Sequence, residues 1–268
     1  MAAPEPTVRY YDTRTPPSRW AISGALAAIV VVLAASITWV ATDGFGRSAG
    51  MAAGEVGTGV LPAGQDGDAS ASGAGGVNGS DAGRRLGVAT DATSVVMVGD
   101  SITQGSRDEI AYTLAAGGFT DVTIDGVVSR RIAAGGGGNP ESGLDAIERL
   151  IAAGADPDVW VIALGTNDIG KYATSEEYGE LVVRVVDLLP DERPLVWVDA
   201  FRDDYVDASR VFNEALRAQL SERDGTVVVD WFDIVSRDRS VLRDGVHPDR
   251  DGEALFAEMV AAGLDLLR

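Results

Sequence analysis

The stretch that decides the fold is Ser-Val-Val-Met-Val-Gly-Asp-Ser-Ile-Thr, residues 94–103. Its four consecutive apolar residues, Val95 to Val98, are typical of a strand that is buried on both faces, as strands of parallel sheets are. Gly99 lets the backbone leave the sheet, so we expect Ser101 in the loop beyond the strand, where open α/β sheets bind ligands. The ordinary alternative is that Asp100 and Ser101 cap a helix.

The same pattern repeats along the rest of the chain. Further strand-like runs occur at Val122–Ile124, Val159–Leu164, Leu195–Val198 and Val227–Val229. Amphipathic stretches lie between the runs or close the chain, at Glu109–Ala116, Gly143–Ala153, Ser175–Leu189, Ala208–Ser221 and Asp251–Leu267. Five strands that alternate with helices predict an α/β domain over residues 93–268, a three-layer α/β/α sandwich around a five-stranded parallel sheet.

The first 92 residues have a different character. Residues 20–42 carry no charge and are long enough for one membrane crossing, which takes about 20 residues. Arginines before this segment and Asp43 after it predict a cytoplasmic tail at 1–19, a signal anchor at 20–42 and the α/β domain outside the membrane. A cleaved signal peptide, which would release the chain, is the alternative. Residues 43–92, rich in Gly, Ala, Ser and Asp, predict a disordered linker.

Composition argues against several classes of function. The chain has 41 acidic and 22 basic residues and a net charge of -19, whereas nucleic-acid binding requires a basic face. It has no cysteine, which excludes disulfides and cysteine-based zinc sites. Its one histidine, His247, excludes multi-histidine metal sites. We therefore expect neither a metal nor another cofactor, and no nucleic-acid partner.

Three further loops follow strands and should reach the same edge of the sheet as Ser101. They begin at Asp125-Gly126, at Gly165-Thr166-Asn167-Asp168 and at Asp244-Gly245-Val246-His247. His247 lies three residues after Asp244, a spacing that allows the carboxylate to orient the imidazole. A lone histidine is more often a surface or packing residue, but here Ser101, His247 and Asp244 form a candidate nucleophile, base and orienting acid.

Developing negative charge on the substrate oxygen also needs hydrogen-bond donors. The candidates are the main-chain N–H groups of Ser101 and Gly126 and the side-chain amide of Asn167. Taken singly, Gly126 could be a turn glycine and Asn167 a turn or cap residue. We expect Asp100, Arg130 and Arg131 to contact the substrate, and the alternative for the two arginines is a plain surface connection.

These blocks, Gly99 to Thr103, Gly126, Gly165 to Asp168 and Asp244 to Pro248, resemble those of the SGNH (GDSL-type) hydrolase family in type and order. The resemblance covers roughly residues 93–268. It implies a flavodoxin-like sandwich and no metal. It also implies Ser101 as nucleophile, His247 as base and Asp244 as orienting acid, with Gly126 and Asn167 as oxyanion donors.

The sequence thus predicts a membrane-anchored serine esterase that removes small O-acyl groups, such as acetyl, from cell-envelope glycans or related esters. An O-acyltransferase with the same three residues, or a lipid esterase, is the alternative. An inactive glycan-binding module is a more remote one, and a phosphotransfer or redox protein is the weakest.

Overall fold

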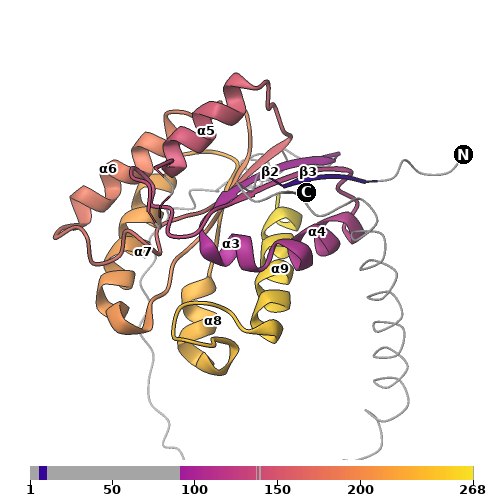
Figure 1. The fold of residues 1–268 in the computed structure, drawn as a ribbon. Coiled ribbons are helices and arrows are strands. Elements are labelled where there is room, and N and C mark those ends of the chain that lie inside the picture. The colour runs from indigo at the N-terminus through magenta and orange to yellow at the C-terminus, as the bar shows by residue number, and fades with distance from the viewer. Residues whose placement is uncertain (1–5, 11–90, 137, 139, 268) are drawn as a thin grey trace, which may run out of the picture. The chain divides into compact units, whose positions relative to one another are not determined.

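The structure is a computed structural model of the chain and describes residues 6–10, 91–136, 138 and 140–267. Its centre is a six-stranded parallel sheet with strand order β1-β3-β2-β4-β5-β6 (Figure 1). The strands are β1 (Thr7–Tyr10), β2 (Ser94–Gly99), β3 (Asp121–Gly126), β4 (Val159–Ala163), β5 (Leu195–Val198) and β6 (Thr226–Val229).

Helices cover both faces of this sheet (Figure 1). One face carries α3 (Ser101–Gly105), α4 (Arg107–Ala116), α8 (Trp231–Arg237) and α9 (Arg250–Asp265). The other face carries α5 (Gly143–Ala152), α6 (Ser175–Val186) and α7 (Val206–Leu220). Two short 3₁₀ helices, η1 (Asp203–Tyr205) and η2 (Arg239–Val241), lie in loops. The three-layer α/β/α sandwich expected from the sequence is confirmed.

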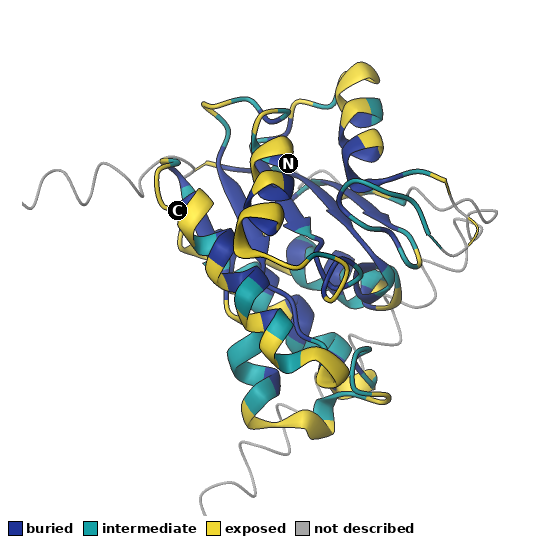
Figure 2. Cartoon of the chain, turned by 90° about the vertical axis from the view of Figure 1, so that its left-hand side faces the viewer, coloured by how far each residue is buried: buried dark blue, intermediate teal, exposed yellow. Residues whose placement is uncertain are grey.

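Alternate residues of each strand supply the two cores. Val95 and Met97 of β2 pack with the α4 and α9 side of the sheet, whereas Val96 and Val98 pack with the α5, α6 and α7 side. Figure 2 shows the result, with buried strands at the centre and exposed residues along the outer faces of the helices. A strand buried on both faces needs a continuous apolar run, which is why the sequence of β2 is recognisable.

The sheet has six strands and not the expected five. The additional strand, β1, pairs in parallel with β3 at the edge of the sheet. It comes from residues 1–19, which the sequence predicts as a separate cytoplasmic tail. The structure places Thr7–Tyr10 in the sheet of the domain, and the location of residues 1–19 relative to a membrane stays a prediction.

The predicted anchor at 20–42 and nearly all of the predicted linker at 43–92 lie outside the described residues. Among the residues that are described, no helix has the length and apolar character needed to cross a membrane.

Candidate active site

Ser101 is the first residue of α3, directly beyond the carboxyl end of β2. Asp100 is the N-cap of this helix, and its Oδ1 accepts a hydrogen bond of 2.9 Å from the Ile102 N–H. The capping interpretation is therefore confirmed for Asp100, and the cap leaves Ser101 available for the site role that stays a prediction. An N–H in the first turn of a helix has no acceptor within the helix, so the Ser101 N–H is left for another oxygen.

A tight loop between η2 and α9 fixes His247. Leu242 and Pro248 form an antiparallel bridge across the loop, and Gly245 has a φ of 81°, a conformation that favours glycine. Asp244 Oδ1 accepts hydrogen bonds from the Val246 and His247 N–H groups at 3.1 and 2.8 Å. These bonds hold the carboxylate so that its second oxygen is free to meet the imidazole ring.

The loop and the helix bring three side chains into one line. Ser101 Oγ lies 2.9 Å from His247 Nε2, and His247 Nδ1 lies 2.8 Å from Asp244 Oδ2. Partial burial alone would raise the pKa of Asp244, but hydrogen bonds from the main chain and ring of His247 and from Val246 lower it to about 2. A carboxylate that stays charged keeps the proton of the neutral ring on Nδ1 and leaves Nε2 as the acceptor.

Gly126 ends β3 directly against the first turn of α3. A Cβ at this position would lie 2.5 Å from the main-chain nitrogen of Gln104 and 2.9 Å from the carbonyl carbon of Thr103. Only glycine allows this close approach, which brings the end of β3 beside the helix that carries Ser101.

Asn167, in the loop after β4, faces the same edge. Its Nδ2 donates to Asp100 Oδ2 and to the main-chain oxygen of Arg130, each at 3.1 Å. Two acceptors around one atom identify that atom as the nitrogen of the amide, so the orientation of the side chain is fixed. Both amide hydrogens point toward protein oxygens in this structure.

Two of the residues expected to contact the substrate are buried. Asp100 is 1% exposed and holds Ile102 and Asn167, and Arg130 is 0% exposed with its guanidinium bonded inside the protein. For these two the prediction of substrate contact is wrong, because neither presents a polar atom to solvent. Arg131 is partly exposed, so its contact with the substrate stays a prediction.

Three carboxyl groups near the carboxyl ends of the strands carry raised pKa values. Burial raises the pKa of Asp100 to about 6, although hydrogen bonds from Ile102 and Thr166 and the nearby His247 and Arg130 oppose it. Burial likewise raises the pKa of Asp168 and of Asp199 to about 7. The sequence pattern around Asp168 indicates no role for its side chain. In the structure its Oδ2 accepts a 2.9 Å hydrogen bond from Ile132 N–H and so ties the loop after β3 to the loop after β4.

The burial of Asp168 makes folding stability depend on pH. The unfolded carboxyl loses its proton near pH 4, whereas the folded one holds it up to about pH 7, so the contribution of Asp168 to stability falls as the pH rises between these values. Asn cannot ionise. Asp168→Asn should therefore gain on the order of 2–4 kcal/mol over the wild type at pH 8 and little at pH 4, since one pKa unit corresponds to about 1.4 kcal/mol.

Thermal melts of both proteins from pH 4 to pH 8 measure this difference. The control is Glu148→Gln on α5, which neutralises an exposed carboxylate and should change the melting temperature little at any pH. A difference between Asp168→Asn and wild type that is the same at every pH would contradict the prediction.

Among the described side chains, no group of three or more His, Cys, Asp or Glu residues lies close enough together to hold a metal ion.

Comparison with known proteins assigns the family. The model of the GDSL-like lipase/acylhydrolase family matches residues 97–255, more than half of the chain and all four blocks described above. The chain belongs to this family. By this family it is a GDSL-like lipase/acylhydrolase, a hydrolase of carboxylic esters. Comparison with curated protein sequences gave no significant match.

Solved structures share the fold of this GDSL-like hydrolase at low sequence identity. The C-terminal catalytic domain of peptidoglycan O-acetyltransferase A from Streptococcus pneumoniae is 17% identical, with a TM-score of 0.53, over 66% of this chain and 94% of that one. A member of the lipolytic G-D-S-L family from Veillonella parvula is 22% identical, with a TM-score of 0.52, over 63% and 96%. Est24, a carbohydrate acetylesterase from Sinorhizobium meliloti, is 16% identical, with a TM-score of 0.50, over 65% and 99%.

Proposed function

We propose that the protein is a serine esterase that works through an acyl-enzyme. The single observation that carries the proposal is the line from Ser101 Oγ to His247 Nε2, at 2.9 Å, and from His247 Nδ1 to Asp244, at 2.8 Å. His247 takes the proton of Ser101 as Oγ attacks the ester carbonyl, and Asp244 stabilises the imidazolium that forms. His247 then gives the proton to the leaving alcohol, and a water activated by the same ring releases the acid.

The carbonyl oxygen of the ester becomes negatively charged in the tetrahedral intermediate, and hydrogen-bond donors must stabilise that charge. The Ser101 N–H, the Gly126 N–H and the Asn167 amide are the proposed donors. Ser101 begins α3, Gly126 ends β3 and Asn167 lies in the loop after β4, all at the same edge of the sheet. Main-chain donors at a helix start are fixed before the reaction begins, so they need little reorganisation as charge develops.

As substrate we propose small O-acyl esters, acetyl above all, on cell-envelope glycans. The composition of the first part of the chain and the likeness of its fold to solved structures support this substrate class. The apolar segment at 20–42 and the polar composition of 43–92 favour a catalytic domain tethered at a membrane and facing the envelope. Proteins with the same fold include a carbohydrate acetylesterase and the catalytic domain of a peptidoglycan O-acetyltransferase.

The test uses the full-length protein, a chromogenic acetate ester and intact-mass detection. We expect turnover together with a transient increase in mass of one acetyl group on the protein. An acetylated glycan is then offered as substrate, and free acetate should appear. Absence of both turnover and the acetyl adduct would contradict the proposal and favour a binding module.

An O-acyltransferase is the competing outcome, since it forms the same acyl-enzyme and differs only in what accepts the acyl group. The same experiment separates the two activities when an unacetylated glycan is added together with the chromogenic ester. Acetyl groups that appear on the glycan in place of free acetate would identify a transferase.

A further inference from the structure

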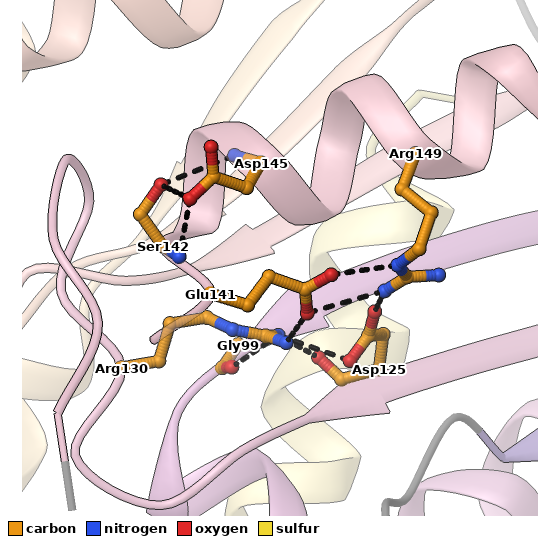
Figure 3. Close-up of polar contacts among 7 residues, drawn as sticks. All are labelled: Gly99, Asp125, Arg130, Glu141, Ser142, Asp145 and Arg149. Atoms are coloured by element: carbon orange, nitrogen blue, oxygen red, sulfur yellow. Dashed lines mark hydrogen bonds and ion pairs between the residues drawn. The ribbon is translucent and has the colours of Figure 1, made fainter. Parts of the chain in front are cut away.

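The loop between β3 and α5 contains a side chain that turns inward. Arg130 is fully buried, and its Nη1 donates to the main-chain oxygens of Gly99 at 3.2 Å and of Asp125 at 2.9 Å (Figure 3). Gly99 is the last residue of β2, and Asp125 is the last but one of β3. One guanidinium therefore ties together the ends of the two strands that lead to Ser101 and Gly126.

The same guanidinium is held by a cluster of ion pairs. Arg130 contacts Asp125 Oδ1 at 3.0 Å and Glu141 Oε2 at 2.8 Å, and Arg149 of α5 pairs with both carboxylates (Figure 3). Two positive and two negative groups balance. Because the cost of removing charges from water offsets most of such pairing, the cluster adds little net stability over apolar packing. The guanidinium also fixes the geometry of its hydrogen bonds, since its N–H donors lie in one rigid plane.

The main chain of Arg130 makes a second connection to the site. Its carbonyl oxygen accepts one of the two Asn167 amide hydrogens, at 3.1 Å. The preceding residue, Ser129, has a φ of 59°, and it is the one non-glycine residue in the described part of the chain with a positive φ. This conformation costs an L-residue roughly 1–2 kcal/mol and persists where the surroundings impose it. The anchored side chain of Arg130 is such a constraint, and it directs the carbonyl toward Asn167.

We propose that Arg130 is a positioning residue for the oxyanion hole. Its guanidinium sets the spacing of the strand ends that present the Ser101 and Gly126 N–H groups, and its carbonyl sets the Asn167 amide. Arg130 does not touch the substrate and exchanges no proton. The inference rests on the proposed function, because it concerns the donors of that acyl-transfer reaction.

The first test compares Arg130→Met with Arg149→Met in the full-length protein. Both changes remove one positive charge from the same cluster. Arg130 donates to the main-chain oxygens of Gly99 and Asp125, whereas the ion pairs of Arg149 are with the side chains of Asp125 and Glu141. Displacement of a reacting group by about 1 Å costs about 10²-fold in rate. We therefore expect kcat for the acetate ester to fall about 10- to 100-fold in Arg130→Met, with KM within about threefold. Arg149→Met should stay within about threefold of wild type in kcat.

Arg130→Met should fold, since Arg149 remains beside both Asp125 and Glu141. If it does not fold, Arg130→Lys replaces it in every assay. Lysine keeps the positive charge but lacks the planar set of N–H donors, so we expect kcat to fall at least about fivefold. A folded Arg130 variant with unchanged kcat would overturn the proposal.

A double-mutant cycle with Asn167→Ala separates positioning from general loosening of the fold. If Arg130 acts partly through Asn167, its removal costs less once the amide is gone. The product of the two single losses in kcat should then exceed the loss in Arg130→Met/Asn167→Ala by at least about fivefold. Fully multiplicative losses would show that Arg130 does not act through Asn167 and would overturn that half of the proposal.

Amide hydrogen exchange gives a readout that needs no activity. Exchange in residues 127–134 should be faster in Arg130→Met than in wild type and unchanged in Arg149→Met, because the Arg130 guanidinium ties this loop to the main-chain oxygens of Gly99 and Asp125 at the strand ends. Equal exchange in both variants overturns the positioning role. If wild type and Ser101→Ala are equally inactive, the proposed function fails, and the exchange data still decide whether Arg130 positions the loop.

Discussion

Ser101→Ala should lose ester turnover by on the order of 10⁴-fold or more while the protein stays folded. The substitution removes only the hydroxyl group, whose oxygen is the proposed nucleophile and lies 2.9 Å from His247 Nε2. The variant should also show no acetyl adduct by intact mass and no labelling by a fluorophosphonate, which reacts with activated serines.

The matched control is Ser106→Ala. Ser106 lies at the start of α4, just beyond α3, is buried, and its hydroxyl has no hydrogen-bond partner among the described residues. Its removal should leave kcat within about threefold of the wild-type value, because the hydroxyl makes no hydrogen bond to any described residue of the site. Retention of more than about 1% of the wild-type turnover by Ser101→Ala would contradict the assignment of the nucleophile.

Asp244→Asn should lower kcat by about 10³- to 10⁴-fold with little change in KM. The amide oxygen of Asn can still accept from the Val246 and His247 N–H groups, so the loop should keep its shape. The amide nitrogen then faces His247 Nδ1, and a donor in that position forces the ring proton onto Nε2. A protonated Nε2 cannot take the proton of Ser101.

Asp249→Asn, two residues beyond His247, is the control for loss of one negative charge from the same loop. Asp249 caps α9 through Gly252 N–H, and Asn is an equally good N-cap, so its activity and stability should be nearly those of wild type. Steady-state kinetics on one ester measure both variants. A loss of less than about tenfold in Asp244→Asn would show that the carboxylate does not set the ring proton.

The strands of the core could be predicted from sequence because burial on both faces requires a continuous run of apolar residues. A strand between two layers of helices needs apolar residues on both faces, and runs such as Val95 to Val98 meet that need without interruption. The sequence of β1 has no such apolar run. Its four residues alternate between exposed and half-buried, and it is a strand because the edge of β3 accepts it.

The short helices were missed for a related reason. The five residues of α3 and the seven of α8 are too few to show a helical period, although the Asp100 cap of α3 was visible as a sequence pattern. Ser101, Asp244 and His247 could be proposed because each follows a strand or lies in a tight local loop. The inward direction of Arg130 could not be predicted, since an arginine after a turn is usually solvated. Its burial depends on Glu141, a distant partner that Arg149 of α5 holds in place.

The pairing of β1 also bears on where the enzyme works. A chain that crossed a membrane once between Tyr10 and Ser94 would have β1 and β3 on opposite sides, and the pair could not exist. The proposed location at the envelope therefore implies that an anchored molecule leaves the edge of β3 without this strand. An unpaired strand edge is a surface on which other strands can add.

The position of Asn167 has a consequence for inhibitor design. Its two amide hydrogens already face the carboxylate of Asp100 and the carbonyl of Arg130, so a substrate oxygen must compete for one of them. A neutral ester carbonyl is a poor competitor, and an oxygen with a full negative charge is a good one. A hydrogen bond from the Asn167 amide that forms only as charge develops on the substrate oxygen raises kcat, but it does not tighten the binding of the uncharged ester. Boronates and phosphonates, which carry that charge when bound to Ser101, should therefore bind this site far more tightly than uncharged ester analogues of the same shape.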